Sequence, residues 1–281
     1  MYYKDTSSPE PVYTLITGAS QGLGKAFARE CAKRKMNLLL VSLPGEDLPE
    51  LCRDINQEFG VDVQCLEIDL AKPDGPSRVY HWAVSRYRVN MLINNAGIGG
   101  SRKYDECSID YIDTIIMLNI RTVALLTKLL IGELKNHSRS YILNISSIAA
   151  FSPVPFKTVY PASKSFIYSF SRGLREELRE TPVKVAVIHP GPIMTNPEVT
   201  ERIRRQGMLA RLTILPAEQV ARIALKRSFK GHTVITPGFF NKLCKWMMKS
   251  LPVRLRISIA SRALRRELDE KRKYVKKIKV A

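Results

Sequence analysis

The stretch Thr17-Gly18-Ala19-Ser20-Gln21-Gly22-Leu23-Gly24 joins an apolar run at 12–17 to an amphipathic pattern at about 22–35. Glycines there allow a tight turn and let backbone amides approach a pyrophosphate, and the N-terminus of the following helix supplies partial positive charge. A glycine-rich turn alone is weak evidence, because glycine also serves ordinary turns. The strand before it and the helix after it favour a dinucleotide-binding turn, with these contact residues: Gly18, Ser20, Gln21, Gly22, Leu23 and Gly24.

The same alternation continues along the chain. Further short apolar runs occur at 37–42, 63–68, 91–94, 141–146, 183–189 and 233–236, and helical patterns lie at about 46–59, 75–88, 108–135, 158–180 and 217–229. They predict an α/β fold of the Rossmann type, a doubly wound parallel sheet of about seven strands with helices on both faces. We expect a single dinucleotide-binding catalytic domain at 1–240, with a substrate lid at about 196–212, and a basic amphipathic helical extension at 241–281.

The composition is that of a globular protein: the 281 residues are 45% hydrophobic. The five cysteines form no CxxC pair, so neither a metal site nor a disulfide framework is indicated. The N-terminus lacks a signal-peptide pattern, and the most apolar stretch, 114–134, is interrupted by Arg121 and Lys128. We therefore expect a cytoplasmic protein that does not span a membrane.

Polar and small residues follow the third and fourth predicted strands. Asp69-Leu70 places a carboxylate where it can accept a hydrogen bond from an adenine amino group, although an Asp in such a turn is also ordinary. Asn95, Ala96 and Gly97 follow the next strand, where small residues permit close approach of the backbone to a ligand. Both segments end strands at the edge where open α/β sheets bind ligands.

Ser147, Tyr160 and Lys164 form the pattern that points most directly to chemistry. Tyr160 and Lys164 are four residues apart on a predicted helix, so their side chains share a face, and the ammonium is expected to lower the pKa of the phenol. Tyr160 can then exchange a proton at neutral pH, while the Ser147 hydroxyl hydrogen-bonds a substrate oxygen. A lone Tyr-x-x-x-Lys pair is more often a solvated helix face.

Two further features complete the pattern. Asn119 lies in the middle of a predicted helix, where Asn is a poor helix former and its amide needs a partner. The sixth strand ends in His189-Pro190-Gly191-Pro192-Ile193-Met194-Thr195, a rigid turn at the same edge of the sheet. We expect His189 to be structural.

Together these motifs resemble the classical short-chain dehydrogenase/reductase family over about residues 11–237: TGASQGLG, DL, NNAG, a mid-helix Asn, a Ser 13 residues before the Tyr of YPASK, and HPGPIMT. The resemblance implies an NAD(P)-dependent oxidoreductase that interconverts ketones and secondary alcohols, with a tetrad of Asn119, Ser147, Tyr160 and Lys164. It implies that Lys164 also binds the nicotinamide ribose and that Asn119 holds a proton-relaying water. It further implies that Pro190, Gly191, Ile193 and Thr195 border the cofactor, with Ile193 and Thr195 anchoring the carboxamide, and that the protein is a homodimer or homotetramer.

The choice of cofactor is expected at the end of the second strand, Val41-Ser42-Leu43-Pro44. A carboxylate there would accept the ribose hydroxyls of NAD, and an arginine would meet the 2′-phosphate of NADP. The sequence has neither, and the positive net charge and the Ser42 hydroxyl favour NADP(H).

The net charge of +19 is concentrated in the extension, where 241–281 holds 14 Lys or Arg and 3 acidic residues. An aromatic and methionine stripe with lysines beside it predicts either a helix packed on the domain or peripheral contact with an anionic membrane surface. By analogy with tail-extended family members, the expected substrate is a hydrophobic carbonyl, such as a 3-oxoacyl chain, 3-ketosphinganine or a steroid.

Two other functions remain open at this point. A nucleotide-sensing regulator on the same fold would be expected to lose its Tyr or Lys, and both are present. A nucleic-acid binder could use the basic tail, but the chain has no recognisable nucleic-acid motif.

Overall fold

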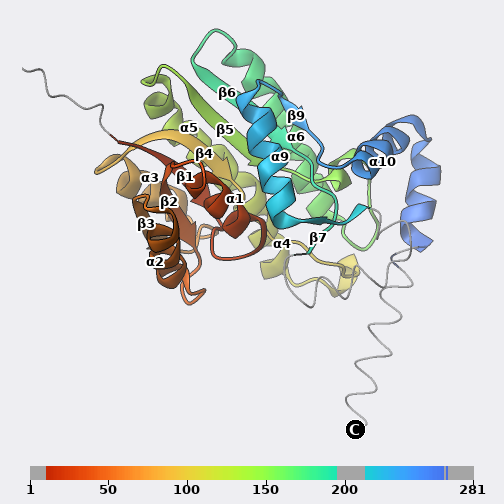
Figure 1. The fold of residues 1–281 in the computed structure, drawn as a ribbon. Helices are drawn as coiled ribbons and strands as arrows, with labels where there is room; N and C mark the ends of the chain where they lie inside the picture. Colours follow the sequence, from red (N-terminus) through yellow and green to blue (C-terminus); the bar gives the residue numbers. More distant parts are fainter. Residues whose placement is uncertain (1–10, 195–212, 263, 265–281) are drawn as a thin grey trace, which may run out of the picture.

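The computed structural model describes residues 11–194, 213–262 and 264. Its centre is a seven-stranded, wholly parallel sheet in the order β3-β2-β1-β4-β5-β6-β9 (Figure 1). The strands are β1 Val12–Thr17, β2 Asn37–Ser42, β3 Val63–Glu67, β4 Arg88–Asn94, β5 Ser140–Ile145, β6 Val183–Ile188 and β9 Val234–Ile235. The predicted doubly wound sheet is confirmed. A second, two-stranded sheet joins β7, Ile193–Met194, to β8, Leu215–Pro216, and was not predicted.

Both faces of the sheet are covered by helices, because alternate side chains of each buried strand point to opposite faces. Leu38 and Leu40 of β2 pack on one face and Leu39 and Val41 on the other, all fully buried. The first face carries α1 (Gly22–Ala32), α2 (Leu48–Phe59) and α9 (Ala217–Phe229). The second carries α3 (Gly75–Val84), α5 (Thr122–Lys135) and α6 (Val159–Glu177).

The helix predicted at 108–135 differs from expectation in its middle. It consists of α4 (Ile109–Ile116), a π-helical turn (Met117–Arg121) and α5. A π-helical turn is rare and depends on tertiary contacts, so the sequence pattern gave no sign of it.

By length and composition this helix, Ile109–Lys135, is the one among the described residues that could cross a membrane, with a mean hydropathy of 1.7 in a window that is 39% buried. Leu126, Leu130 and Leu134 of its α5 part are fully buried against the sheet. A helix that forms part of a core passes the same test, so this is weak evidence for a span.

The chain after β9 continues into α10, Phe239–Ser250, at the end of the sheet opposite β3 (Figure 1). Asn241 anchors this helix: the side chain is buried, and Nδ2 donates to Thr213 O at 3.0 Å and to Pro237 O at 2.9 Å. A further helical segment occupies 253–262. The expected extension therefore begins as an ordered helix fixed to the domain by a buried polar side chain.

Candidate active site

The glycine-rich turn follows β1 and leads directly into α1. Gly18 and Gly22 have φ of +64° and +54°, and a Cβ on Gly24 would lie 1.9 Å from Gly18 O, so these positions require glycine. No side chain caps the N-terminus of α1, which leaves its first amides available to an anion. Leu23 is buried in the core, so only its backbone can face a ligand. The turn fits a pyrophosphate.

The end of β4 braces this turn. Asn95 Nδ2 donates to Thr17 O and Gly18 O, both at 3.0 Å, and the amides of Asn95 and Ala96 both donate to Thr17 Oγ1 at 3.1 Å. Asn95 and Ala96 thus lie against the glycine-rich turn. Ligand contact by these residues stays a prediction.

Gly97 lies where the predicted tetrad converges. A Cβ on Gly97 would be 3.0 Å from Asn119 Oδ1 and 3.2 Å from Lys164 Nζ, so both groups border the same small space. A Cβ on Gly99 would be 2.6 Å from the Tyr160 ring. Glycine at positions 97 and 99 therefore leaves the room that the tetrad side chains occupy.

Asn119 is fully buried in the π-helical turn. Its Oδ1 accepts from Ile98 N and its Nδ2 donates to Ile98 O, both at 2.9 Å, and Nδ2 also lies 3.1 Å from Ser163 Oγ. Ser163 Oγ in turn donates to Tyr160 O at 2.7 Å. The Asn119 amide therefore has the hydrogen-bond partners that a buried amide needs. Its contact with Ser163 ties the π-helical turn to α6.

Lys164 is held by the end of β5. Its Nζ donates to Ile145 O at 3.0 Å, and Ser146 Oγ donates to Lys164 O at 2.7 Å. The side chain is buried, and burial lowers the pKa of the ammonium from 10.5 to about 8.

Tyr160 and Ser147 meet beside Lys164. Ser147 caps the short helix Ile148–Phe151, with Oγ accepting from Ala149 N at 3.2 Å. Burial raises the pKa of Tyr160, and the hydrogen bond with Ser147 opposes that shift. Burial therefore outweighs the lowering that was expected from the ammonium, whose Nζ lies 5.7 Å from the Tyr160 ring centroid and donates to Ile145 O.

The turn after β6 packs behind Ser147. His189 is fully buried, with Nδ1 3.0 Å from Ser147 O, and Pro190 O accepts from Ile148 N at 3.0 Å. Burial, with Lys245 and Lys249 nearby, lowers the pKa of His189 to about 4. His189 therefore stays neutral near neutral pH and supports the Ser147 backbone.

Beyond Pro190 the turn meets α10. A Cβ on Gly191 would overlap Asn241 Oδ1 at 2.2 Å, and Ile193 pairs with Leu215. Asn241 was not singled out in the sequence analysis. The sign of its role is a single Asn that directly follows the apolar residues Phe239 and Phe240. Thr195 and the expected lid at 196–212 lie outside the described residues.

At the end of β3, Asp69 Oδ1 accepts from Ala71 N at 2.8 Å, so the carboxylate shapes its own turn. Leu70 is buried, and its carbonyl accepts from Thr122 Oγ1 at 2.7 Å. These contacts fix the strand end, and recognition of adenine by Asp69 stays a prediction.

At the end of β2, Ser42 is buried and its hydroxyl donates to Leu43 O at 3.0 Å. The group that reaches the glycine-rich turn is instead Glu46, whose carboxylate accepts from Ser20 Oγ. Sequence reasoning missed Glu46 because it considered only the strand end. The signal was the spacing, since Glu46 follows Gly24 by 22 residues and Rossmann folds carry an acidic group about 20 residues after the glycines.

Comparison with known proteins agrees with this arrangement. A family model described as short chain dehydrogenase matches residues 13–206, more than half of the chain. The chain belongs to this family. The match spans the glycine-rich turn, all four tetrad residues and the turn after β6.

Individual members give the range of similarity. The chain is 34% identical over 189 residues to a very-long-chain 3-oxoacyl-CoA reductase of Anas platyrhynchos, covering 65% of this chain and 60% of that protein. It is 31% identical over 185 residues to 17-beta-hydroxysteroid dehydrogenase type 3 of Homo sapiens, covering 65% and 59%. The chain thus spans about 60% of the length of these curated relatives.

A solved structure shares the fold over almost its whole length. It is a short-chain dehydrogenase from Sphingobium yanoikuyae in complex with NADPH, 26% identical, with a TM-score of 0.72 and coverage of 86% of this chain and 96% of that one.

Proposed function

We propose that this protein is an NAD(P)(H)-dependent oxidoreductase that interconverts a ketone and a secondary alcohol, acting as a reductase of a hydrophobic carbonyl. The observation that carries the proposal is the convergence of Ser147, Tyr160, Lys164 and Asn119 beside a turn that fits a pyrophosphate. Family membership supports the same reaction class.

A nicotinamide dinucleotide held here would supply hydride to the carbonyl carbon in reduction or accept it from the alcohol in oxidation. Tyr160 Oη donates a proton to the substrate oxygen in reduction and accepts it in oxidation, and the Ser147 hydroxyl hydrogen-bonds that oxygen and stabilises the developing charge. Lys164 holds an ammonium near the phenol and binds the nicotinamide ribose, and Asn119 fixes the water that relays protons to Lys164. The buried hydrogen bonds of Lys164 and Asn119 keep both groups oriented without help from the ligand.

The proposed function also concerns which residues contact the cofactor and which cofactor they favour. We propose contact with the dinucleotide by Gly18, Ser20, Gln21, Gly22, Leu23, Gly24, Asp69, Leu70, Asn95, Ala96, Gly97, Pro190, Gly191, Ile193 and Thr195. NADP(H) was favoured from the sequence through Ser42 and the positive charge, and this preference stays a prediction. Ser42 has another partner, which removes one of the two arguments for it.

A hydrophobic substrate is supported by the surroundings of Tyr160. The space beside its ring is small, about 10 Å³, and is lined by Tyr104, Tyr111, Ile115, Phe156 and Val159 together with Arg102, Lys157 and Thr158. It holds no more than a water molecule, so the support for a hydrophobic substrate is the apolar majority of the side chains next to Tyr160. The names of the curated relatives favour a 3-oxoacyl chain first and a steroid ketone second.

The test is oxidation of NADH and NADPH in the presence of 3-oxoacyl-CoA substrates graded by chain length, with a steroid ketone and a ketose beside them. We expect kcat/KM to rise with chain length, because each buried CH₂ contributes about 0.8 kcal/mol. Turnover of the ketose alone would contradict the substrate class, and no turnover with any ketone would contradict the reaction.

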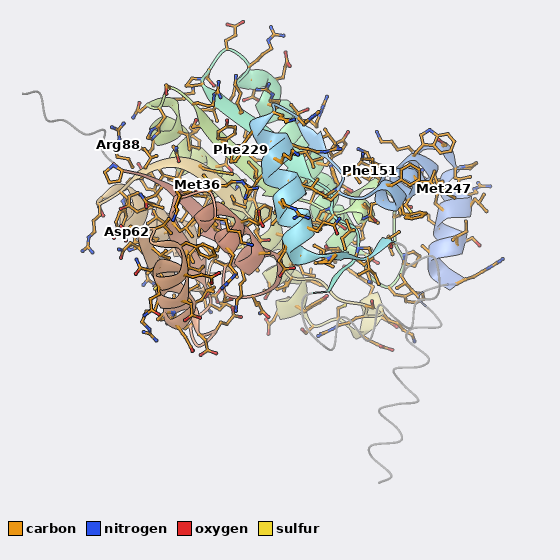
Figure 2. All side chains as sticks on the ribbon, viewed as in Figure 1. Met36, Asp62, Arg88, Phe151, Phe229 and Met247 are labelled. Carbon is orange, nitrogen blue, oxygen red and sulfur yellow. The ribbon has the colours of Figure 1, made fainter. Side chains whose placement is uncertain are left out.

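We also propose that the C-terminal segment contacts an anionic membrane surface. Phe239 and Trp246 of α10 are 73% and 65% exposed, and residues 239–262 contain six Lys or Arg and no acidic residue. Lys245 and Lys249 lie over the ring of Phe151, which Figure 2 labels beside α10. An exposed aromatic face with lysines around it is typical of a helix in the headgroup region.

This contact is tested by co-sedimentation with phosphatidylserine vesicles at low and high salt, with zwitterionic vesicles as the control. We expect binding to the anionic vesicles that weakens with salt, since each Lys or Arg near the surface contributes about 1 kcal/mol. Absence of binding at low salt would mean that the segment packs on the domain and does not contact a membrane.

A homodimer or homotetramer is proposed through the outer faces of α4, α5 and α6. Ile109 and Ile116 of α4 and Phe166 of α6 are large apolar side chains that remain exposed in the single chain. Sedimentation equilibrium checks this, and a monomer at micromolar concentration would contradict it.

A further inference from the structure

The loop between β2 and α2 approaches the glycine-rich turn through Glu46. One carboxylate oxygen accepts from Ser20 Oγ, and the other lies 3.5 Å from Gln21 Nε2. Two loops that follow different strands are thus joined by a carboxylate directly beside the proposed pyrophosphate site.

The backbone holds Glu46 in this place. Gly45 N donates to Glu67 Oε1 at the end of β3, at 3.1 Å, and Gly45 has a φ of +77°, which favours glycine. Immediately after the loop, the fully buried Leu48 begins α2. Because the loop is fixed on both sides of Glu46, its carboxylate is directed at Ser20 by the fold.

This place is where a dinucleotide presents its adenosine ribose. In doubly wound folds the pyrophosphate lies at the N-terminus of the first helix, and an acidic side chain near the end of the second strand accepts the ribose hydroxyls. Ser42 at the strand end is buried, and its hydroxyl donates to Leu43 O. Glu46, four residues further on, has the required chemistry.

The charges around Glu46 oppose a phosphate. The cleft at this point, about 480 Å³, is lined by four acidic residues and one lysine: Ser20, Gln21, Lys25, Glu46, Asp47, Glu50, Leu51 and Asp54. Leu43, which follows the strand, is 45% exposed and apolar. A 2′-phosphate carries up to two negative charges and would meet an excess of carboxylates here.

We propose that Glu46 is the residue that determines cofactor specificity, accepting the adenosine ribose hydroxyls of NAD(H) and rejecting the 2′-phosphate of NADP(H). This inference rests on the proposed nicotinamide function. It reverses the preference drawn from the sequence, because the positive net charge resides largely at 241–281 and not beside this cleft.

The test is the affinity of the whole protein for NADH and for NADPH, measured by titration of the nicotinamide fluorescence. Wild type is expected to bind NADH about tenfold or more tightly than NADPH, equivalent to about 1.4 kcal/mol. Glu46→Gln keeps the size of the side chain, removes its charge and replaces one acceptor oxygen by an amide donor. This variant should bind NADPH about tenfold more tightly than wild type does.

Asp54→Asn is the matched control, since it removes one charge from the same cleft on α2 without touching Ser20. Its ratio of NADPH to NADH affinity should stay within about twofold of wild type. The inference is overturned if wild type prefers NADPH, or if the two variants change the ratio equally. If neither dinucleotide binds to wild type, it is the proposed function itself that fails.

Discussion

At the catalytic end of the crevice Lys164 and Asn119 are buried and bonded to backbone atoms, whereas at the ribose end Ser20 and Glu46 meet through two side chains near the surface. Because their hydrogen-bond partners are buried, Lys164 and Asn119 can adopt only one arrangement. The contact between Ser20 and Glu46 instead depends on the path of an exposed loop. In the proposed function, catalytic geometry is therefore determined by packing, while the proposed cofactor choice depends on a contact that few substitutions would be needed to change.

The largest effect is expected from Tyr160→Phe. Removing the proton donor should lower kcat by ~10³-fold and leave dinucleotide affinity nearly unchanged, because only the hydroxyl is lost. Steady-state kinetics on an accepted ketone, with fluorescence titration of the dinucleotide, measures both. If Tyr160→Phe kept the wild-type rate, Tyr160 would not be the proton donor.

A second effect should appear as pH dependence of stability at the catalytic end. The pKa of His189 is about 4 in the folded protein, below its ordinary value of 6.5, so the unfolded chain takes up the proton first. The free energy of unfolding should thus fall by about 3 kcal/mol as pH drops from 6.5 to 4. Urea denaturation of wild type and His189→Gln at several pH values checks this, and equal pH slopes for the two proteins would refute it.

A matched pair of glycines compares the packed glycine-rich turn with the exposed loop that carries Glu46. Gly24→Ala places a methyl against Gly18 O, and we expect dinucleotide affinity to fall by ~10- to 100-fold, the scale of overpacking. Gly45→Ala meets no atom within 4 Å, so only its positive φ costs about 1 kcal/mol of stability. Titration and thermal unfolding of both variants separate the effects. Comparable losses of affinity would remove the distinction between the packed turn and the exposed loop.

The smallest effect is expected from Ser42→Ala. The Ser42 hydroxyl is buried and donates to its neighbour Leu43 O, so its loss should change the ratio of NADPH to NADH affinity by less than ~2-fold. A selective loss of NADPH affinity would restore Ser42 as a phosphate donor and weaken the role given to Glu46.

The sequence by itself determined the sheet, its strand positions to within a few residues and the grouping of Ser147, Tyr160 and Lys164. These features follow from local periodicity and from parallel strands that end at one edge, so short motifs suffice to predict them. The bounds of β1 and β2 agree with the predicted runs. The Asn119 amide is hydrogen-bonded to Ile98, as a buried amide requires.

Only the tertiary structure decided the π-helical turn around Asn119, the raised pKa of Tyr160, the anchoring of α10 by Asn241 and the approach of Glu46 to Ser20. Each depends on groups that are distant in sequence and on how deeply they are buried, and neither property is written in a local pattern. Glu46 is the clearest case: its identity and spacing are visible in the chain, but the direction of its carboxylate depends on Gly45 and Glu67, which fix the loop only once β2 and β3 are paired.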